Sequence, residues 1–142
     1  MGKHLRIMVV LMLVAALWTA SAAGVVAAQR PLRIGLSLPS LSFAWFVFLE
    51  QAVKERAAQL GNVEIISLDA QNNVAKQMAD IEDLIVRRVD GVLLVPIDVQ
   101  ALIPGIEALN AAKIPVVTVD RMAEGGEILA HVGADNVEGG RQ

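Results

Sequence analysis

Strand-like and helix-like patterns alternate along almost the whole chain from residue 32 onward. Short apolar runs rich in β-branched residues are separated by longer segments in which apolar residues recur every three or four positions. The predicted strands cover residues 32–38, 63–68, 91–95, 115–119 and 128–133, and the predicted helices cover residues 44–60, 73–88 and 98–112. Repeated βα units imply a parallel sheet with right-handed crossovers and helices on both faces. We therefore predict an α/β fold of the doubly wound type.

Each predicted helix carries one apolar stripe that should face the sheet. In the first helix this stripe comprises Phe46, Leu49, Val53, Ala57 and Leu60. Gly61 is expected to cap this helix, because glycine adopts the left-handed backbone of a C-terminal cap without strain. Asp98 is expected to cap the third helix, and Pro104 must then lie near its first turns or bend it.

Residues 1–28 have the pattern of a secretory leader. Lys3 and Arg6 form a basic start, an apolar run follows over residues 7–18, and small residues come after it. The competing interpretation is an uncleaved transmembrane anchor. The apolar run is shorter than a bilayer usually requires, which favours a cleaved signal peptide.

We place the cleavage after Ala28, with Ala22 or Ala23 as alternatives, so that residues 29–142 form one domain-sized unit. Loss of the leader removes two basic and no acidic residues, and the formal net charge changes from −3 to −5. This mildly acidic balance, without a Lys/Arg block, argues against nucleic acid as a partner. The chain has no cysteine, which excludes disulfides, thiolate metal sites and a lipid attached to cysteine.

Motifs for catalysis and for cofactor binding are missing from the sequence. The turn at residues 39–43, after the first strand, has no glycine-rich phosphate cradle, and no G-x-S-x-G motif occurs. No His or Cys residues cluster as metal ligands would, and His131 lies alone in a predicted strand, where a structural role is favoured. We therefore expect a protein that is not an enzyme and that uses no cofactor or metal.

Polar residues follow the predicted strands at their carboxyl ends, where α/β sheets bind ligands. The pair Asp120 and Arg121 comes directly after the fourth strand. A carboxylate can accept two hydroxyl hydrogen bonds and a guanidinium offers a rigid fork of donors, which suits a polyhydroxylated ligand such as a sugar. The alternative is a surface ion pair that caps the strand. Asp98, which follows the third strand, is favoured as a helix cap over a ligand contact.

Three aromatic residues, Phe43, Trp45 and Phe46, follow the first strand. Aromatic rings pack against the C–H faces of sugars, so all three are candidate ligand contacts. Phe46 also belongs to the apolar stripe of the first helix, and a core role is its alternative. Trp45 lies about 100° off the direction of Phe46 around the helix and is expected to be exposed.

Residues 32–142 resemble the first lobe of the ribose-type periplasmic sugar-binding proteins, the substrate-binding subunits of sugar ABC transporters. The matching segments are 44–47 (AWFV), 68–73 (LDAQNN), 96–98 (PID), 114–121 (IPVVTVDR), 135–136 (DN) and 139–140 (GG). The resemblance implies that the aromatics at positions 45 and 46 sandwich a sugar, and that Asp120 and Arg121 bind its hydroxyls. Pro39 stands where ribose binders have a serine, and Phe43 where they have a ligand-binding asparagine. Both departures replace polar contacts with bulk, and they favour another pentose, hexose or polyol over ribose.

The resemblance also implies a type I periplasmic-binding-protein fold of two lobes, with the ligand held between them. Residues 134–135 match the first crossing between the lobes, so we expect a fragment truncated there, with the second lobe absent. The implied protein is exported to the periplasm and passes its sugar to an ABC permease in the inner membrane. One alternative is a sugar-sensing protein that serves a chemoreceptor or a sensor kinase. Another is an envelope α/β enzyme, which the missing motifs disfavour.

Overall fold

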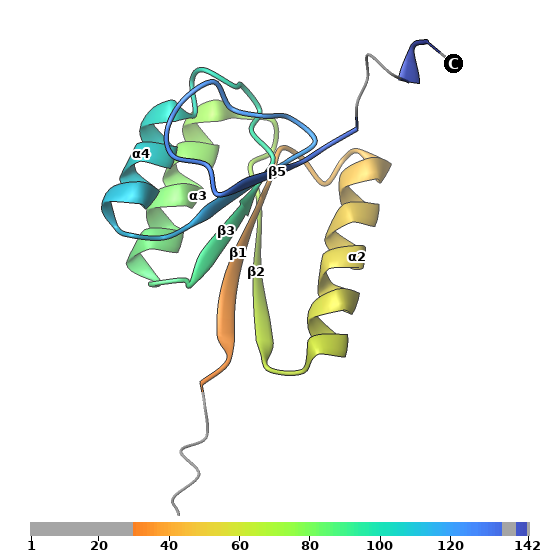
Figure 1. Ribbon diagram of the computed structural model, residues 1–142, viewed down its shortest axis with the longest axis vertical. Coiled ribbons are helices and arrows are strands. Elements are labelled where there is room, and N and C mark those ends of the chain that lie inside the picture. The colour runs from red at the N-terminus through yellow and green to blue at the C-terminus, as the bar shows by residue number, and fades with distance from the viewer. Residues whose placement is uncertain (1–29, 135–138, 142) are drawn as a thin grey trace, which may run out of the picture.

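The computed structural model describes residues 30–134 and 139–141 (Figure 1). Its elements in chain order are β1 (Leu32–Leu38), α2 (Ala44–Leu60), β2 (Val63–Asp69), α3 (Val74–Val86), β3 (Gly91–Leu94), α4 (Ile103–Ala111), β4 (Val116–Val119) and β5 (Ala130–Val132). The leader predicted over residues 1–28 and the match at 135–136 lie outside the described residues. In the part that is described, no helix combines the length and the apolar character needed to cross a membrane.

All five strands are parallel and lie in the order β2-β1-β3-β4-β5. The register pairs Ile34 with Ile65 of β2 on one side and with Gly91 of β3 on the other. The chain therefore leaves β1 in one direction to form β2 and then returns to its other side to form β3. This reversal is the topological switch point at which open α/β sheets bind ligands, next to the carboxyl ends of β1 and β3.

Helices cover both faces of the sheet, as the alternating pattern predicts. Figure 1 shows α2 on one face and both α3 and α4 on the other. The larger core joins α3 and α4 to the sheet through the fully buried residues Ile81, Leu84, Ile106 and Leu109. The smaller core lies under α2 and includes Leu36, Leu38, Phe46 and Val95. The predicted α/β fold with a parallel sheet is confirmed.

The first helix has the predicted bounds, and Gly61 follows it with φ at 89°. Its backbone N–H donates to the carbonyl of Ala57, so the glycine closes the last turn. Leu60 was predicted to face inward and is instead exposed. The sheet face beside the last turn of α2 is open, and Leu60 borders an apolar groove there together with Ile34 and Val63.

The third predicted helix begins later than expected, because Asp98 caps a separate turn. The Oδ1 atom of Asp98 accepts the backbone N–H groups of Gln100 at 2.9 Å and Ala101 at 2.8 Å. The helix α4 starts only at Ile103, with Pro104 in its first turn. Proline has no N–H to donate to the carbonyl of Gln100, so the regular helical ladder cannot extend back through this point. A proline also precedes β4, and the predicted start at residue 115 moves to Val116 for the same reason.

Candidate functional site

The turns that follow β1, β3 and β4 lie next to one another at the carboxyl edge of the sheet. The strand order puts β3 between β1 and β4. Neighbouring strands are about 4.8 Å apart, so the turns after β1 and β4 are separated by about 10 Å. The first of these turns carries Phe43 and leads into Trp45, and the second carries Asp120 and Arg121. Topology thus brings the predicted aromatic and polar residues to one edge.

Asp120 occupies an unusual backbone conformation directly after β4. Its φ is 66°, in the left-handed region, and the N–H of Arg121 donates to the carbonyl of Val119 at 2.7 Å across it. The N–H of Asp120 donates to the carbonyl of Val132 in β5 at 2.9 Å. A non-glycine residue held in this region costs about 1–3 kcal/mol, so the hydrogen bonds around it must hold it there. The strand end and β5 together therefore hold the Asp120 backbone in place and leave its side chain exposed.

Arg121 anchors the turn after β4 to the turn after β3. Its Nη1 donates to the carbonyls of Ile97 at 2.9 Å and of Pro96 at 3.4 Å. The Nε atom lies 3.8 Å from Oδ2 of Asp120, which is too long for a strong hydrogen bond. Among the described residues, Arg121 is the side chain that pairs with the Asp120 carboxylate. An exposed pair at this distance contributes little to stability, so the carboxylate keeps its capacity to accept ligand hydroxyls.

Two of the three predicted aromatic residues are exposed at the carboxyl edge. Phe43 and Trp45 are each 55% exposed, which confirms the exposure predicted for Trp45. Phe46 is only 6% exposed and packs in the smaller core. Its ring meets that of Phe43 edge to face, with centroids 6.3 Å apart. In this geometry Phe46 supports Phe43 from below, and a ligand contact by Phe46 itself stays a prediction.

Sequence analysis missed Gln77, which connects the strand ends beneath the site. Gln77 in α3 is fully buried, and its Nε2 donates to Ser37 Oγ at 3.1 Å and to the Val95 carbonyl at 2.9 Å. Its Oε1 accepts the N–H of Ile97 at 2.9 Å. It therefore fixes the segment whose carbonyls hold Arg121. The available signal was a polar residue on the apolar stripe of this helix, four residues before Ile81.

Asp69, at the end of β2, orders the turn that carries the aromatics. Its Oδ1 accepts the N–H groups of Leu41 at 3.2 Å and Gln71 at 2.9 Å. The N–H of Asn72 donates to the carbonyl of Pro39 at 2.6 Å. Because these bonds occupy Oδ1 of Asp69 and brace the loop, this residue helps to hold the site in shape.

Asp98 also lies at this edge, and one oxygen of its carboxylate is engaged. The N–H groups of Ala101 and then Gln100 lower its pKa, because both hydrogen bonds favour the charged carboxylate. The capping role predicted from the sequence is therefore the role that the geometry supports, although Asp98 caps a turn that precedes α4.

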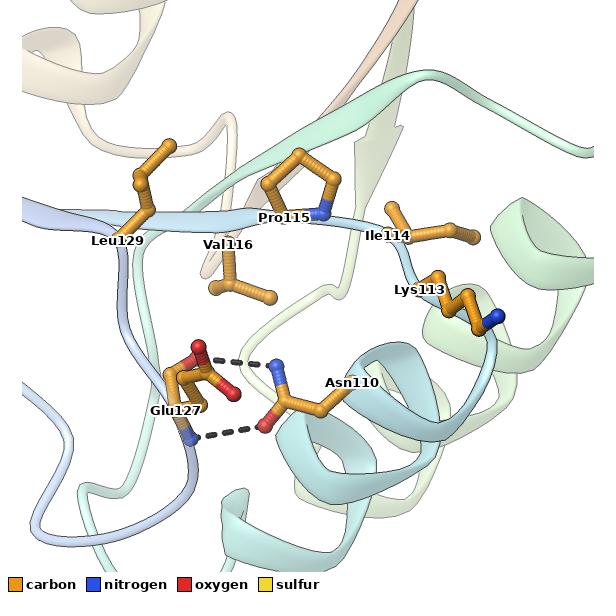
Figure 2. A pocket seen from close by; sticks show the side chains of 7 residues that line it. All are labelled: Asn110, Lys113, Ile114, Pro115, Val116, Glu127 and Leu129. Atoms are coloured by element: carbon orange, nitrogen blue, oxygen red, sulfur yellow. Dashed lines mark hydrogen bonds between the residues drawn. The ribbon is translucent and has the colours of Figure 1, made fainter.

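A pocket of about 290 Å³ lies far from this edge, at the amino end of β4. Figure 2 shows Asn110 reaching across it to the backbone of Glu127. The Asn110 amide donates to the Glu127 carbonyl at 2.9 Å and accepts the Glu127 N–H at 2.8 Å. These bonds tie α4 to the segment before β5, so the polar groups here serve as a structural brace. Over residues 30–134 and 139–141, no group of three acidic, His or Cys side chains is placed to hold a metal.

Comparison with known proteins assigns the family. The model of the periplasmic binding protein domain matches residues 34–142. The chain belongs to this family. It is 41% identical over 112 residues to the ribose import binding protein of Bacillus subtilis (strain 168), covering 79% of this chain and 36% of that protein. The ribose import binding protein of Escherichia coli (strain K12) is 39% identical over 108 residues, with 76% and 36% covered.

Solved structures of binding proteins have the same fold. The Caulobacter myo-inositol binding protein bound to myo-inositol superposes with a TM-score of 0.74 at 37% identity, covering 83% of this chain and 40% of that one. An ABC transporter solute binding protein from Mycobacterium smegmatis with bound glycerol gives a TM-score of 0.71 at 37% identity, with 75% and 36% covered. The fold is thus part of a type I periplasmic binding protein. The chain spans little more than a third of the length of these relatives.

Proposed function

We propose that the chain is the first lobe of an exported binding protein that holds a monosaccharide or related polyol and delivers it to an ABC permease. The observation that carries the proposal is the pairing, at one edge, of exposed aromatic rings with an exposed carboxylate. Phe43 and Trp45 supply the rings, and Asp120 supplies the carboxylate beside the anchored Arg121. Ligands named for the relatives, namely ribose, xylitol, myo-inositol and glycerol, are all polyhydroxylated.

Each of these residues has a defined role in the proposed site. The rings of Phe43 and Trp45 pack against C–H faces of the sugar, and Asp120 accepts hydrogen bonds from its hydroxyls. Arg121 donates from the nitrogens that do not hold the turn after β3, and Phe46 supports the ring of Phe43. Phe43 is exposed and gives the site apolar bulk, whereas Pro39 is buried and does not reach the surface. This composition favours another pentose, a hexose or a related polyol over ribose.

Export follows from the leader predicted over residues 1–28. Cleavage after Ala28 would leave Gln29 as the first residue of the periplasmic protein, without a lipid anchor. The intact mass of the exported product tests this prediction. A product that retains Trp18 and fractionates with membranes would favour the anchor instead.

A titration of the ¹⁵N-labelled chain with pentoses, hexoses and polyols tests the proposed site. We expect weak, saturable shifts of the Trp45 indole and of the Asp120 and Arg121 amides. Asn110 and Lys113, which line the pocket in Figure 2, serve as internal controls and should not move. Shifts confined to that pocket, or no shifts with any sugar, would overturn the proposal.

A sensory role is the second candidate, and one structural relative favours it. The fructose binding periplasmic domain of the hybrid two component system BT1754 superposes with a TM-score of 0.72 at 26% identity, covering 78% of this chain and 36% of that one. The same site could then present a sugar to a sensor kinase or a chemoreceptor. Genes for an ATPase and a permease beside this one support transport, whereas a receptor gene in their place supports sensing.

A further inference from the structure

An unassigned aromatic residue, Phe48, lies against Trp45 on the surface of α2. The two rings are stacked, with centroids 6.0 Å apart and planes at 28°. Residues three positions apart in a helix are neighbours on its surface. Phe48 is 63% exposed and Trp45 is 55% exposed, so the pair lies outside the core that Phe46 joins.

Stacking has a specific consequence for an exposed tryptophan. An indole without neighbours at the start of a helix can move among several staggered rotamers. An aromatic pair of this kind changes the ratio between rotamer populations by about two- to tenfold. Phe48 covers part of one side of the indole, and the remaining exposed surface is left for a ligand. One side of the Trp45 indole therefore contacts Phe48, and the other side stays open, before any ligand binds.

We propose that Phe48 is a positioning residue that holds the indole of Trp45 with one side open to the sugar. The inference rests on the proposed function, because Phe48 can position Trp45 for a sugar only if Trp45 contacts one. It adds that the aromatic surface of the site extends along α2 beyond the residues expected to contact the ligand. Phe48 itself acts through Trp45 and needs no contact with the sugar.

The stack can be tested without a ligand in the whole chain carrying Trp18→Phe, which leaves Trp45 as its single tryptophan. The variants are Phe48→Ala, Phe48→Leu, which keeps apolar bulk without a ring, and Phe48→Tyr, which keeps the ring. Val47→Ala is the matched control, since Val47 is also exposed on α2 and belongs to neither ring pair. The readouts are the near-ultraviolet circular dichroism of Trp45 and its fluorescence anisotropy decay, with far-ultraviolet spectra to verify folding.

We expect Phe48→Ala and Phe48→Leu to lose the tryptophan dichroism and to increase the local mobility of the indole. Phe48→Tyr and Val47→Ala should match the parent chain. If Phe48→Ala leaves both signals unchanged, the stack does not position Trp45 and the inference is wrong.

A sugar titration of the same variants, followed by the indole resonance, separates the two claims. We expect the affinity of Phe48→Ala to be about two- to tenfold weaker than that of the parent, with recovery in Phe48→Tyr. Equal affinity in all variants, together with a lost stack, would overturn the positioning role and leave the proposed function intact. If neither the parent nor any variant binds a sugar, the proposed function is wrong, and so is the positioning role of Phe48 in sugar binding.

Discussion

Asp98 and Asp120 both follow strands at the carboxyl edge, but backbone N–H groups hold the carboxylate of Asp98 and not that of Asp120. Two backbone N–H groups hold Asp98, whereas Asp120 has a loose contact to Arg121. Asp120→Asn keeps the side-chain shape and the tolerance of a positive φ, and it removes the charge. We expect it to weaken sugar binding by about 1.5–3 kcal/mol, the value of a hydrogen bond to a charged group. Asp98→Ala should leave binding unchanged and lower the free energy of unfolding by about 1 kcal/mol, as the loss of a cap does.

Urea unfolding and sugar titrations by NMR measure the two effects on the same pair of variants. The opposite pattern, with Asp98→Ala losing the sugar and Asp120→Asn losing only stability, would mean that the roles of the two residues are exchanged.

Asp90 gives the fold a predictable response to acid. Hydrogen bonds from the Arg30 side chain and then from the Arg33 backbone lower its pKa from 3.8 to about 2. Because the folded pKa is below the unfolded one, the stabilisation is complete above about pH 4 and disappears as the pH falls toward 2. The free energy of unfolding should therefore drop less over this range in Asp90→Asn than in the parent. Urea unfolding at pH 5, 3 and 2 provides the comparison.

Arg30→Gln is the companion variant, because it removes the principal cause of the shift. Its pH response should lie between those of the parent and Asp90→Asn. Parallel curves for all three proteins would contradict a role for this pair.

Elements whose limits depend on local sequence were predicted well. The bounds of α2 follow from its amphipathic pattern and the glycine after it, and they match the structure at both ends. The start of α4 was wrong, because a capped turn at Asp98 and a proline at position 104 compete with the helical pattern. The exposure of Trp45 followed from helical geometry, but its stacking on Phe48 did not, since rotamers depend on neighbours that periodicity does not specify.

The hydrogen bonds of Gln77 connect α3 to the ends of β1 and β3. Gln77→Leu preserves much of the volume and leaves the Ile97 N–H and the Val95 carbonyl without this partner. Unsatisfied buried groups cost about 1–3 kcal/mol, and we expect this loss in urea unfolding. Hydrogen exchange at the Ile97 amide should accelerate. Met78→Leu, in the same helix, removes no side-chain hydrogen bond and should lower the free energy of unfolding by less than about 1.5 kcal/mol. If the two variants lose the same free energy of unfolding, packing and not the hydrogen bonds of Gln77 determines the loss.

At the scale of the whole molecule, the residues proposed to bind the sugar lie on an open surface. The parallel sheet orients its switch point outward, and Phe43, Trp45, Asp120 and Arg121 are all exposed there. A sugar on this surface would keep one face in water. Hydroxyls on that face would continue to exchange hydrogen bonds with solvent, so the contacts of this edge alone determine the affinity.

We therefore expect the chain by itself to bind sugars with an affinity in the millimolar range. Association costs several kcal/mol in translational and rotational freedom, and only the surplus of the contacts over this cost is measured as affinity. Two aromatic faces and one carboxylate at an exposed edge leave a small surplus, a binding free energy on the order of −4 kcal/mol, which corresponds to a millimolar dissociation constant. Isothermal titration calorimetry with pentoses, hexoses and cyclitols should show no tighter binding, and Asp120→Asn should abolish the residual heat. Micromolar binding by the chain alone would mean that this edge encloses its ligand more fully than an open surface can, and the expectation of weak binding would then be wrong.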